Sequence, residues 1–217
     1  MRPYRKANGF IPTRLGPSRF NQRLHRSRAL FLTLFAVLGE TWKELNAASV
    51  YSIDSFPIAA CDNYRIRRCK RSRDKVYRGD LASKKRFCYG FKMHVLATAE
   101  GEPVDFFLTP SSFSDVACLE DFDWDLPPDS TVYADRAYND AEFENTAQTD
   151  SRIEFPPMRR ANMKQQFPPG IRYLQHPFRK RIETTGSLLE QRLPKSIHAV
   201  TARGFELMLA LRVNGFR

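Results

Sequence analysis

The spacing of apolar residues changes several times along the chain, which indicates a mixture of helices and strands. After a polar, proline-containing start, apolar residues recur every three or four positions from Ser18 to about Asn46, as they do on one face of a helix. Ser18 is a suitable helix cap, and we expect Gly39 to divide the segment into two helices. The apolar run Ala29–Leu38 is too short to span a bilayer and favours a buried helix.

Short runs of β-branched and aromatic residues predict the strands. The first is Ala48–Ile58, which we expect Pro57 to end. The runs Phe87–Thr98 and Pro103–Thr109 flank a turn at Glu100–Gly101 and predict a hairpin. Later runs at residues 130–138 and 152–160 predict two more strands.

Helical patterns follow the hairpin and recur to the end of the chain. We expect a short helix after Ser114, one capped by Asn139, one over residues 177–192 and one over 201–211. The segments 61–80 and 161–177 have no clear period and predict loops.

The order of these elements predicts a mixed α/β fold, with a central sheet flanked by helices. Three strands, then alternating helices and strands, is the ribonuclease-H-like order. At 217 residues the chain is long enough for one well-buried domain. We divide it into a short basic N-terminal helical segment, residues 1–47, and a ribonuclease-H-like domain, residues 48–217.

Three acidic residues occupy different local settings. Asp54 in "VYSIDSFPI" and Asp135 in "TVYADRAYND" each follow an apolar, β-prone run, and Glu183 lies in the helical pattern "FRKRIETTGSLLEQ". Carboxylates from two strands and a helix suit a site that binds two Mg²⁺ ions and transfers a phosphoryl group, because Mg²⁺ prefers oxygen ligands. The sequence therefore predicts a Mg²⁺ site, with Mn²⁺ as an alternative ion.

Each acid also has a plainer interpretation. Asp54 is alternatively a strand-end turn residue, and Asp135 a partner of Arg136. Glu183 is alternatively an exposed residue that pairs with Arg179 one helical turn away, in which case Glu154 or Glu190 competes for the third position.

The charge of the chain favours a polyanionic partner. The net charge is +11 and the isoelectric point is near 9.7. Residues 93–150 hold fourteen Asp and Glu against Arg136 alone, whereas residues 61–92 hold twelve Lys and Arg against three Asp. Because phosphate neutralisation dominates nucleic-acid affinity, such one-sided basic blocks favour nucleic-acid binding over a merely solvated surface.

The candidate phosphate contacts come from three basic groups that flank the acids. They are Arg65, Arg67, Arg68 and Lys70; Lys84, Lys85 and Arg86; and Arg179, Lys180 and Arg181. Few aromatic residues alternate with the first group, so it is typical of phosphate contact rather than base stacking.

Several classes of protein are disfavoured. The four cysteines have neither C-x-x-C nor finger spacing, which argues against zinc and for free thiols in a reducing cytosol. Neither a nucleophile elbow nor a Gly-rich phosphate loop is present, so neither a serine hydrolase nor a nucleotide cofactor is indicated.

Longer motifs in the same order resemble a known family. They are "DSFP", "YRGDLASKKRFCYGFKMH", "FFLTPSSFSD", "YADRAYND" and "RKRIETTGSLLEQRLPKSIHAVTARGFELML". From about Ser52 to the C-terminus the chain resembles the DDE transposases of bacterial insertion sequences, with insertion-sequence family 982 as the nearest match, within the group named for the transposase DDE domain.

The resemblance implies both a site and partners. It implies that Asp54, Asp135 and Glu183 hold the metal ions, and that the substrates are terminal inverted repeats and target DNA. It further implies a homodimer or larger assembly on DNA, in the bacterial cytoplasm at the nucleoid. Relatives carry a Tyr and a Lys around the Glu, where this chain has His176 and Glu190.

The N-terminal helical region is shorter than in relatives, and the end "LRVNGFR" is abrupt, which leads us to expect a truncated or decayed copy. The alternatives are therefore an inactive DNA-binding remnant, or a related ribonuclease-H-like nuclease or resolvase.

Overall fold

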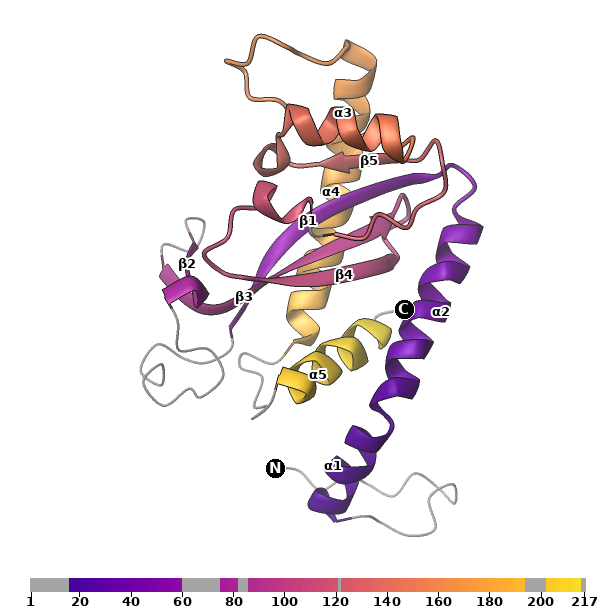
Figure 1. Ribbon diagram of the computed structural model, residues 1–217, viewed down its shortest axis with the longest axis vertical. Helices are drawn as coiled ribbons and strands as arrows, with labels where there is room; N and C mark the ends of the chain where they lie inside the picture. The colour runs from indigo at the N-terminus through magenta and orange to yellow at the C-terminus, as the bar shows by residue number, and fades with distance from the viewer. Residues whose placement is uncertain (1–15, 60–74, 82–85, 121, 194–201, 216–217) are drawn as a thin grey trace.

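A five-stranded mixed sheet forms the centre of the molecule (Figure 1). The computed structural model describes residues 16–59, 75–81, 86–120, 122–193 and 202–215. The strands are β1 (Val50–Ala59), β2 (Arg78–Leu81), β3 (Arg86–Thr98), β4 (Pro103–Pro110) and β5 (Thr131–Ala134). Along the sheet the order is β2-β3-β1-β5, and β4 also pairs with β3.

Helices cover both faces of this sheet. They are α1 (Pro17–Arg26), α2 (Arg28–Leu45), α3 (Ala141–Asp150), α4 (Pro169–Arg192) and α5 (Ala202–Asn214). Side chains of α2, α4 and α5 share one buried cluster with the sheet, and α3 contributes to the cluster on the other face (Figure 1). The mixed α/β fold predicted from the sequence is confirmed, and it is compatible with a ribonuclease-H-like fold.

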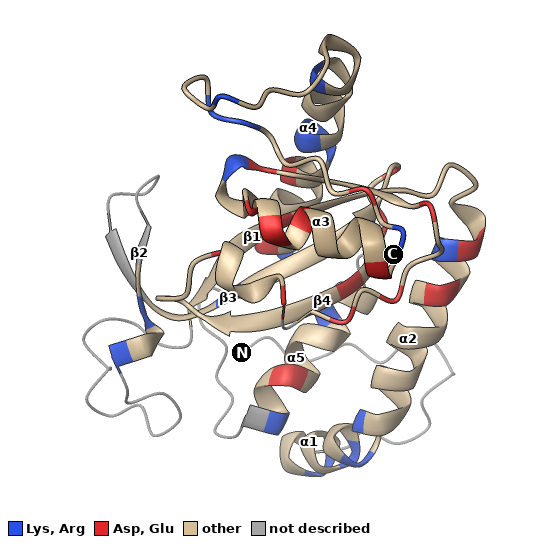
Figure 2. Ribbon diagram, turned by 45° about the horizontal axis from the view of Figure 1, so that its top comes forward, with Lys and Arg blue, Asp and Glu red and all other residues tan. Residues whose placement is uncertain are grey.

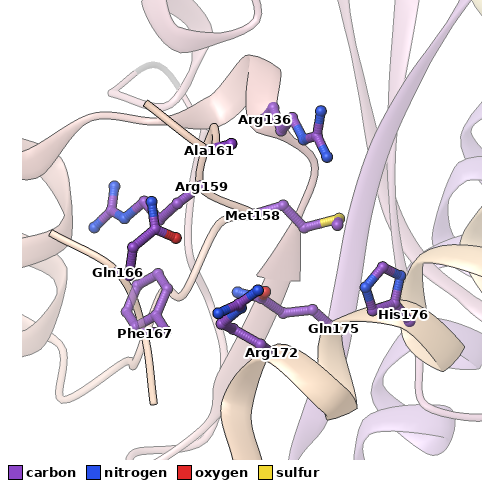
Figure 3. A pocket seen from close by; sticks show the side chains of 9 residues that line it. All are labelled: Arg136, Met158, Arg159, Ala161, Gln166, Phe167, Arg172, Gln175 and His176. Atoms are coloured by element: carbon purple, nitrogen blue, oxygen red, sulfur yellow. The ribbon is translucent and has the colours of Figure 1, made fainter. Parts of the chain in front are cut away.

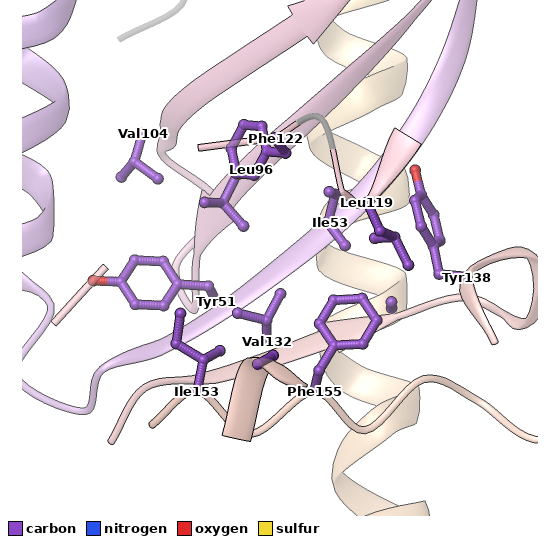
Figure 4. Close-up of a cluster of buried hydrophobic side chains, with 12 residues drawn as sticks. Tyr51, Ile53, Leu96, Val104, Leu119, Phe122, Val132, Tyr138, Ile153 and Phe155 are labelled. Carbon is purple, nitrogen blue, oxygen red and sulfur yellow. The ribbon is translucent and has the colours of Figure 1, made fainter. Parts of the chain in front are cut away.

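Strand β1 connects the two cores because its side chains alternate between the faces of the sheet. Tyr51 and Ile53 belong to the cluster on the α3 side, together with Leu96 and Phe155 (Figure 4). Ile58 belongs to the cluster on the other side, where Ile182 of α4 also lies. Asp54, one residue after Ile53, therefore faces the α4 side.

The antiparallel hairpin is confirmed. Strands β3 and β4 pair, and Gly101 in the connecting turn has a φ of 95°, a conformation that favours glycine.

The N-terminal helices differ from the prediction in three respects. Helix α1 begins at Pro17 after Gly16, so Ser18 lies inside the helix and does not cap it. The break falls at Ser27, not at Gly39, which is buried within α2. A helical glycine costs only about 1 kcal/mol, which the packing of α2 against β4 and α5 offsets. The run Ala29–Leu38 is also only partly buried, since Leu30 and Val37 are exposed. No helix in the described ranges has the length and apolarity needed to cross a membrane.

Prolines do not end the elements where the sequence predicts. Strand β1 continues through Pro57 to Ala59. Its pairing with β5 stops at Ile53, and no other strand among the described residues pairs with that edge beyond it, so the edge tolerates a residue without an N–H. Likewise, α4 begins at Pro169 and carries Pro177 inside it, where a start was expected.

Three smaller predictions also need correction. Residues 152–160 form only isolated bridges to β5, at Glu154 and Pro157, because the prolines there cannot donate to a ladder. The cap of α3 is Asp140, whose side chain accepts from the N–H of Glu142 and Phe143, and not Asn139. Within the segment 61–80, residues 75–77 form a 3₁₀ turn and β2 begins at Arg78.

A buried histidine joins two strands to the turn after β5. His94 Nδ1 lies 2.9 Å from the hydroxyl of Tyr138, and Nε2 lies 3.0 Å from the hydroxyl of Thr109. Burial lowers the pKa of His94 to about 4, so the ring is neutral at pH 7 and needs both partners. The hydroxyl of Tyr138 is therefore a structural group, deep in the fold.

We predict that Tyr138→Phe destabilises the protein by about 1–3 kcal/mol, because it leaves a buried ring nitrogen of His94 without its partner. Urea unfolding at pH 7 measures the difference. The control is Tyr173→Phe, at a side chain that is 77% exposed, and it should change stability by less than about 0.5 kcal/mol. Equal effects of the two substitutions would contradict the structural role of the Tyr138 hydroxyl.

Candidate active site

The three predicted acids meet where β1 and β5 run side by side. These strands are parallel, and their last paired residues are Ile53 and Ala134. Asp54, within β1, and Asp135, directly after β5, are the residues that follow this pair, so their backbones are neighbours. Glu183 lies on α4, which packs against both strands. Asp54 lies within β1, which continues to Ala59, so the alternative of a turn residue at the strand end is wrong.

Asp54 is the most perturbed of the three acids. The N–H of Ser55 donates to its Oδ1 at 2.8 Å, which stabilises the carboxylate. The pKa of Asp54 is nevertheless raised to about 7, chiefly by burial, with a contribution from the negative charges of Asp135, Glu183 and Asp115. A carboxyl with this pKa takes up a proton near neutral pH unless a cation is close.

Arg179 lies between the other two acids. Its Nε donates to Glu183 Oε1 at 2.8 Å, and its Nη1 is 3.2 Å from Asp135 Oδ1. The pairing of Glu183 with Arg179 that the sequence offered as an alternative is therefore present. The guanidinium places one positive charge where two carboxylates converge.

These residues suit a divalent cation by their chemistry. A cavity of about 10 Å³ is lined by Asp54, Asp135, Arg179 and their neighbours. In the ranges that the structure describes, no three His, Cys, Asp or Glu side chains are grouped as a metal site, and Arg179 contacts two of the carboxylates. The guanidinium acts as a stand-in cation, and the carboxylates are ligands that Mg²⁺ prefers.

A fourth acid approaches the site from behind β1. Asp115 accepts a hydrogen bond from Ser55 Oγ at 3.1 Å and pairs with Lys92 Nζ at 3.1 Å. Ser55 follows Asp54, so this pair helps to fix the backbone on which Asp54 lies. The motif "FFLTPSSFSD" contains Asp115, but its sequence does not indicate the contact with β1.

The predicted DNA contacts are only partly described. Arg65, Arg67, Arg68, Lys70, Lys84 and Lys85 lie outside the described residues, and Arg86 begins β3. On α4 the three cations separate: Arg179 faces the acids, Lys180 is exposed, and Arg181 pairs with Glu100 of the hairpin turn at 3.3 Å. Figure 2 shows further basic residues along the loop before α4.

A basic pocket beside the acids was not predicted. It has a volume of about 140 Å³, and its lining includes Arg136, Met158, Arg159, Phe167, Arg172 and His176 (Figure 3). Gln175 lines both this pocket and the cavity at Asp54. The residues that line the basic pocket come from three separate segments, so no local pattern in the sequence could have identified the pocket.

Comparison with known proteins gives one family. The family model described as "Transposase DDE domain" matches residues 45–192, which is more than half of the chain and includes Asp54, Asp135 and Glu183. Neither the curated proteins nor the solved structures contain a match.

The pKa of Asp54 predicts how stability depends on pH without metal. Folding raises this pKa from 3.8 to about 7. The contribution of Asp54 to the free energy of unfolding is therefore complete below pH 3.8 and is lost as the pH rises through about 7. Between pH 5 and pH 8 we expect the free energy of unfolding of the unsubstituted protein to fall by an amount on the order of 1–2 kcal/mol, after allowance for solvent screening. We predict that Asp54→Asn abolishes this fall.

Urea unfolding in EDTA at the two pH values measures this loss. The control is Asp150→Asn, at an exposed carboxylate of α3, and it should keep the pH dependence of the unsubstituted protein. An unchanged pH dependence in Asp54→Asn would contradict the raised pKa.

Proposed function

Since this chain belongs to the Transposase DDE domain family, we propose that it cuts and joins DNA at the ends of an insertion sequence by two-metal phosphoryl transfer. The observation that carries the proposal is the meeting of Asp54, Asp135 and Glu183 from β1, the end of β5 and α4. These three carboxylates would hold Mg²⁺, or Mn²⁺ in its place. When bound, the ions would polarise the phosphodiester and lower the pKa of a water molecule.

The protein groups prepare this site in two ways. Asp54 would give up its proton when a cation binds, because the positive charge would lower the pKa that burial and the neighbouring acids raise. Arg179 leaves the carboxylates and contacts a phosphate oxygen, where its fork of N–H donors fits. The same side chain thus neutralises the acids in the free protein and the substrate in the complex.

The basic blocks support DNA as the substrate. The groups at residues 65–70, 84–86 and 179–181 would neutralise backbone phosphates of the inverted repeats and of target DNA. Residues 1–47 would form a basic helical segment, and residues 48–217 the catalytic domain. The resemblance to insertion-sequence family 982 supports action as a homodimer or larger assembly at the bacterial nucleoid.

We predict that Asp135→Asn lowers Mg²⁺-dependent cleavage of DNA carrying the element ends by at least about 100-fold, because one metal ligand loses its charge. DNA affinity should change little. The control, Asp129→Asn, removes an exposed carboxylate that pairs with Arg152, and should cleave normally. Gel analysis of end-labelled duplexes measures cleavage and joining together.

The products separate the candidate functions. Cleavage followed by joining of the 3′ hydroxyl to a second duplex supports a transposase. Cleavage without joining would indicate a nuclease or resolvase, and binding without cleavage would indicate an inactive DNA-binding remnant. Full cleavage activity in Asp135→Asn would contradict the proposed role of Asp135 as a metal ligand.

Arg179 gives a second prediction. Arg179→Gln should bind Mg²⁺ about 3- to 10-fold more tightly without DNA, because two ion pairs no longer compete for the carboxylates. It should nevertheless cleave DNA more slowly. Titration calorimetry measures the affinity, with Arg152→Gln as the control that changes neither property, since Arg152 forms an exposed ion pair with Asp129. Weaker Mg²⁺ binding in Arg179→Gln would contradict a competition between Arg179 and Mg²⁺ for the carboxylates.

A further inference from the structure

We propose that the basic pocket beside the acids is a second DNA subsite, which binds one backbone phosphate next to the phosphodiester that is cut. The inference rests on the proposed function, because it takes the acids as the place of cleavage. It concerns Arg136 and Arg172, neither of which belongs to the basic groups identified from the sequence.

The pocket adjoins the acids directly. Arg136 follows Asp135 in the chain and lines the pocket, whereas Asp135 lines the cavity at Asp54. Met158 also lines it, and the Sδ atom of Met158 lies 3.7 Å from Nη1 of Arg179. Gln175 lines both the pocket and the cavity at Asp54. A DNA strand that places one phosphate at the acids therefore passes the pocket with its next phosphates.

Two of the arginines are available to an anion. Within the described ranges, neither Arg136 nor Arg172 forms an ion pair, and both are exposed. Arg159 differs, because Glu144 Oε1 accepts from its Nη1 at 2.7 Å and both side chains are largely buried. The guanidinium of Arg159 also lies 4.7 Å from the ring centre of Phe167. Arg159 therefore has a structural role in the lining of the pocket, whereas Arg136 and Arg172 supply positive charge that no described carboxylate balances.

The start of α4 adds to this charge. Its first turn contains Arg172 and no acidic residue, although the N-terminal end of a helix carries partial positive charge. A cation there is disfavoured by the helix dipole, and a bound anion would reverse the effect. The helix end and the two arginines thus favour the same kind of ligand.

The size of the pocket fits a phosphate group. Its volume of about 140 Å³ is many times the roughly 10–15 Å³ that a cavity needs to hold one water. Arginine binds phosphate through paired N–H donors, which suits two guanidiniums around one group. The shared chemistry is a phosphate, whether from a DNA backbone or from free phosphate, and the position beside the acids favours the backbone.

The test measures binding of duplex DNA that carries the element ends, with Ca²⁺ in place of Mg²⁺. The variant is Arg136→Gln/Arg172→Gln, and the matched control is Arg160→Gln/Arg203→Gln, which removes two exposed arginines outside the pocket. The pocket variant should bind DNA about 3- to 30-fold more weakly, with a salt dependence reduced by about one phosphate contact.

Neutral methylphosphonate groups, placed at one phosphate at a time, locate the contact. The unsubstituted protein and the control should lose affinity when the phosphate beside the cleavage position is neutralised, and the pocket variant should not. If the pocket variant keeps its sensitivity at every position, the proposal is wrong. It is also wrong if inorganic phosphate stabilises the unsubstituted protein against heat as strongly as the duplex does, because the pocket would then be a site for free anions.

This readout does not depend on catalysis. If the unsubstituted protein fails to cleave in Mg²⁺, the proposed function fails, while the methylphosphonate scan still reports the subsite by its distance from the DNA end. Circular dichroism checks folding, and the single variant Arg172→Gln replaces the double variant if the latter does not fold.

Discussion

The parallel pairing of β1 with β5 is the constraint on which the site depends. Its register, Ile53 beside Ala134, makes Asp54 and Asp135 neighbours although they are far apart in the chain. A slip of one residue in β1 would turn Asp54 into the α3-side core and expose Ile53 on the other face. The buried side chains of β1 therefore fix the acids as well as the fold.

This arrangement is electrostatically costly, and the cost explains the neighbouring residues. Asp54 is held beside other acids with a pKa of about 7, and Arg179 offsets the repulsion between Asp135 and Glu183. Asp115 and Lys92 balance each other behind the strand. Buried carboxylates that repel one another are well suited to bind a cation, because its positive charge relieves the unfavourable electrostatic energy of the site.

Local patterns predict part of this picture. They place Asp135 after a strand and Glu183 on a helix, because period and capping are local properties. They misplace the helix break at Gly39 and the strand end at Pro57, where tertiary packing and an open strand edge override propensity. The other contacts at the site, those of Arg179 with Asp135 and of the pocket residues with one another, depend on long-range packing that a single sequence does not reveal.

Binding of divalent metal by Asp54, Asp135 and Glu183 together is best tested by anomalous X-ray scattering from crystals of the protein with DNA and Mn²⁺. We expect Mn²⁺ peaks at these three carboxylates, with Arg179 moved from Asp135 and Glu183 to a phosphate oxygen. Peaks at other residues, or an undisturbed Arg179 bridge with the carboxylates free of metal, would contradict it.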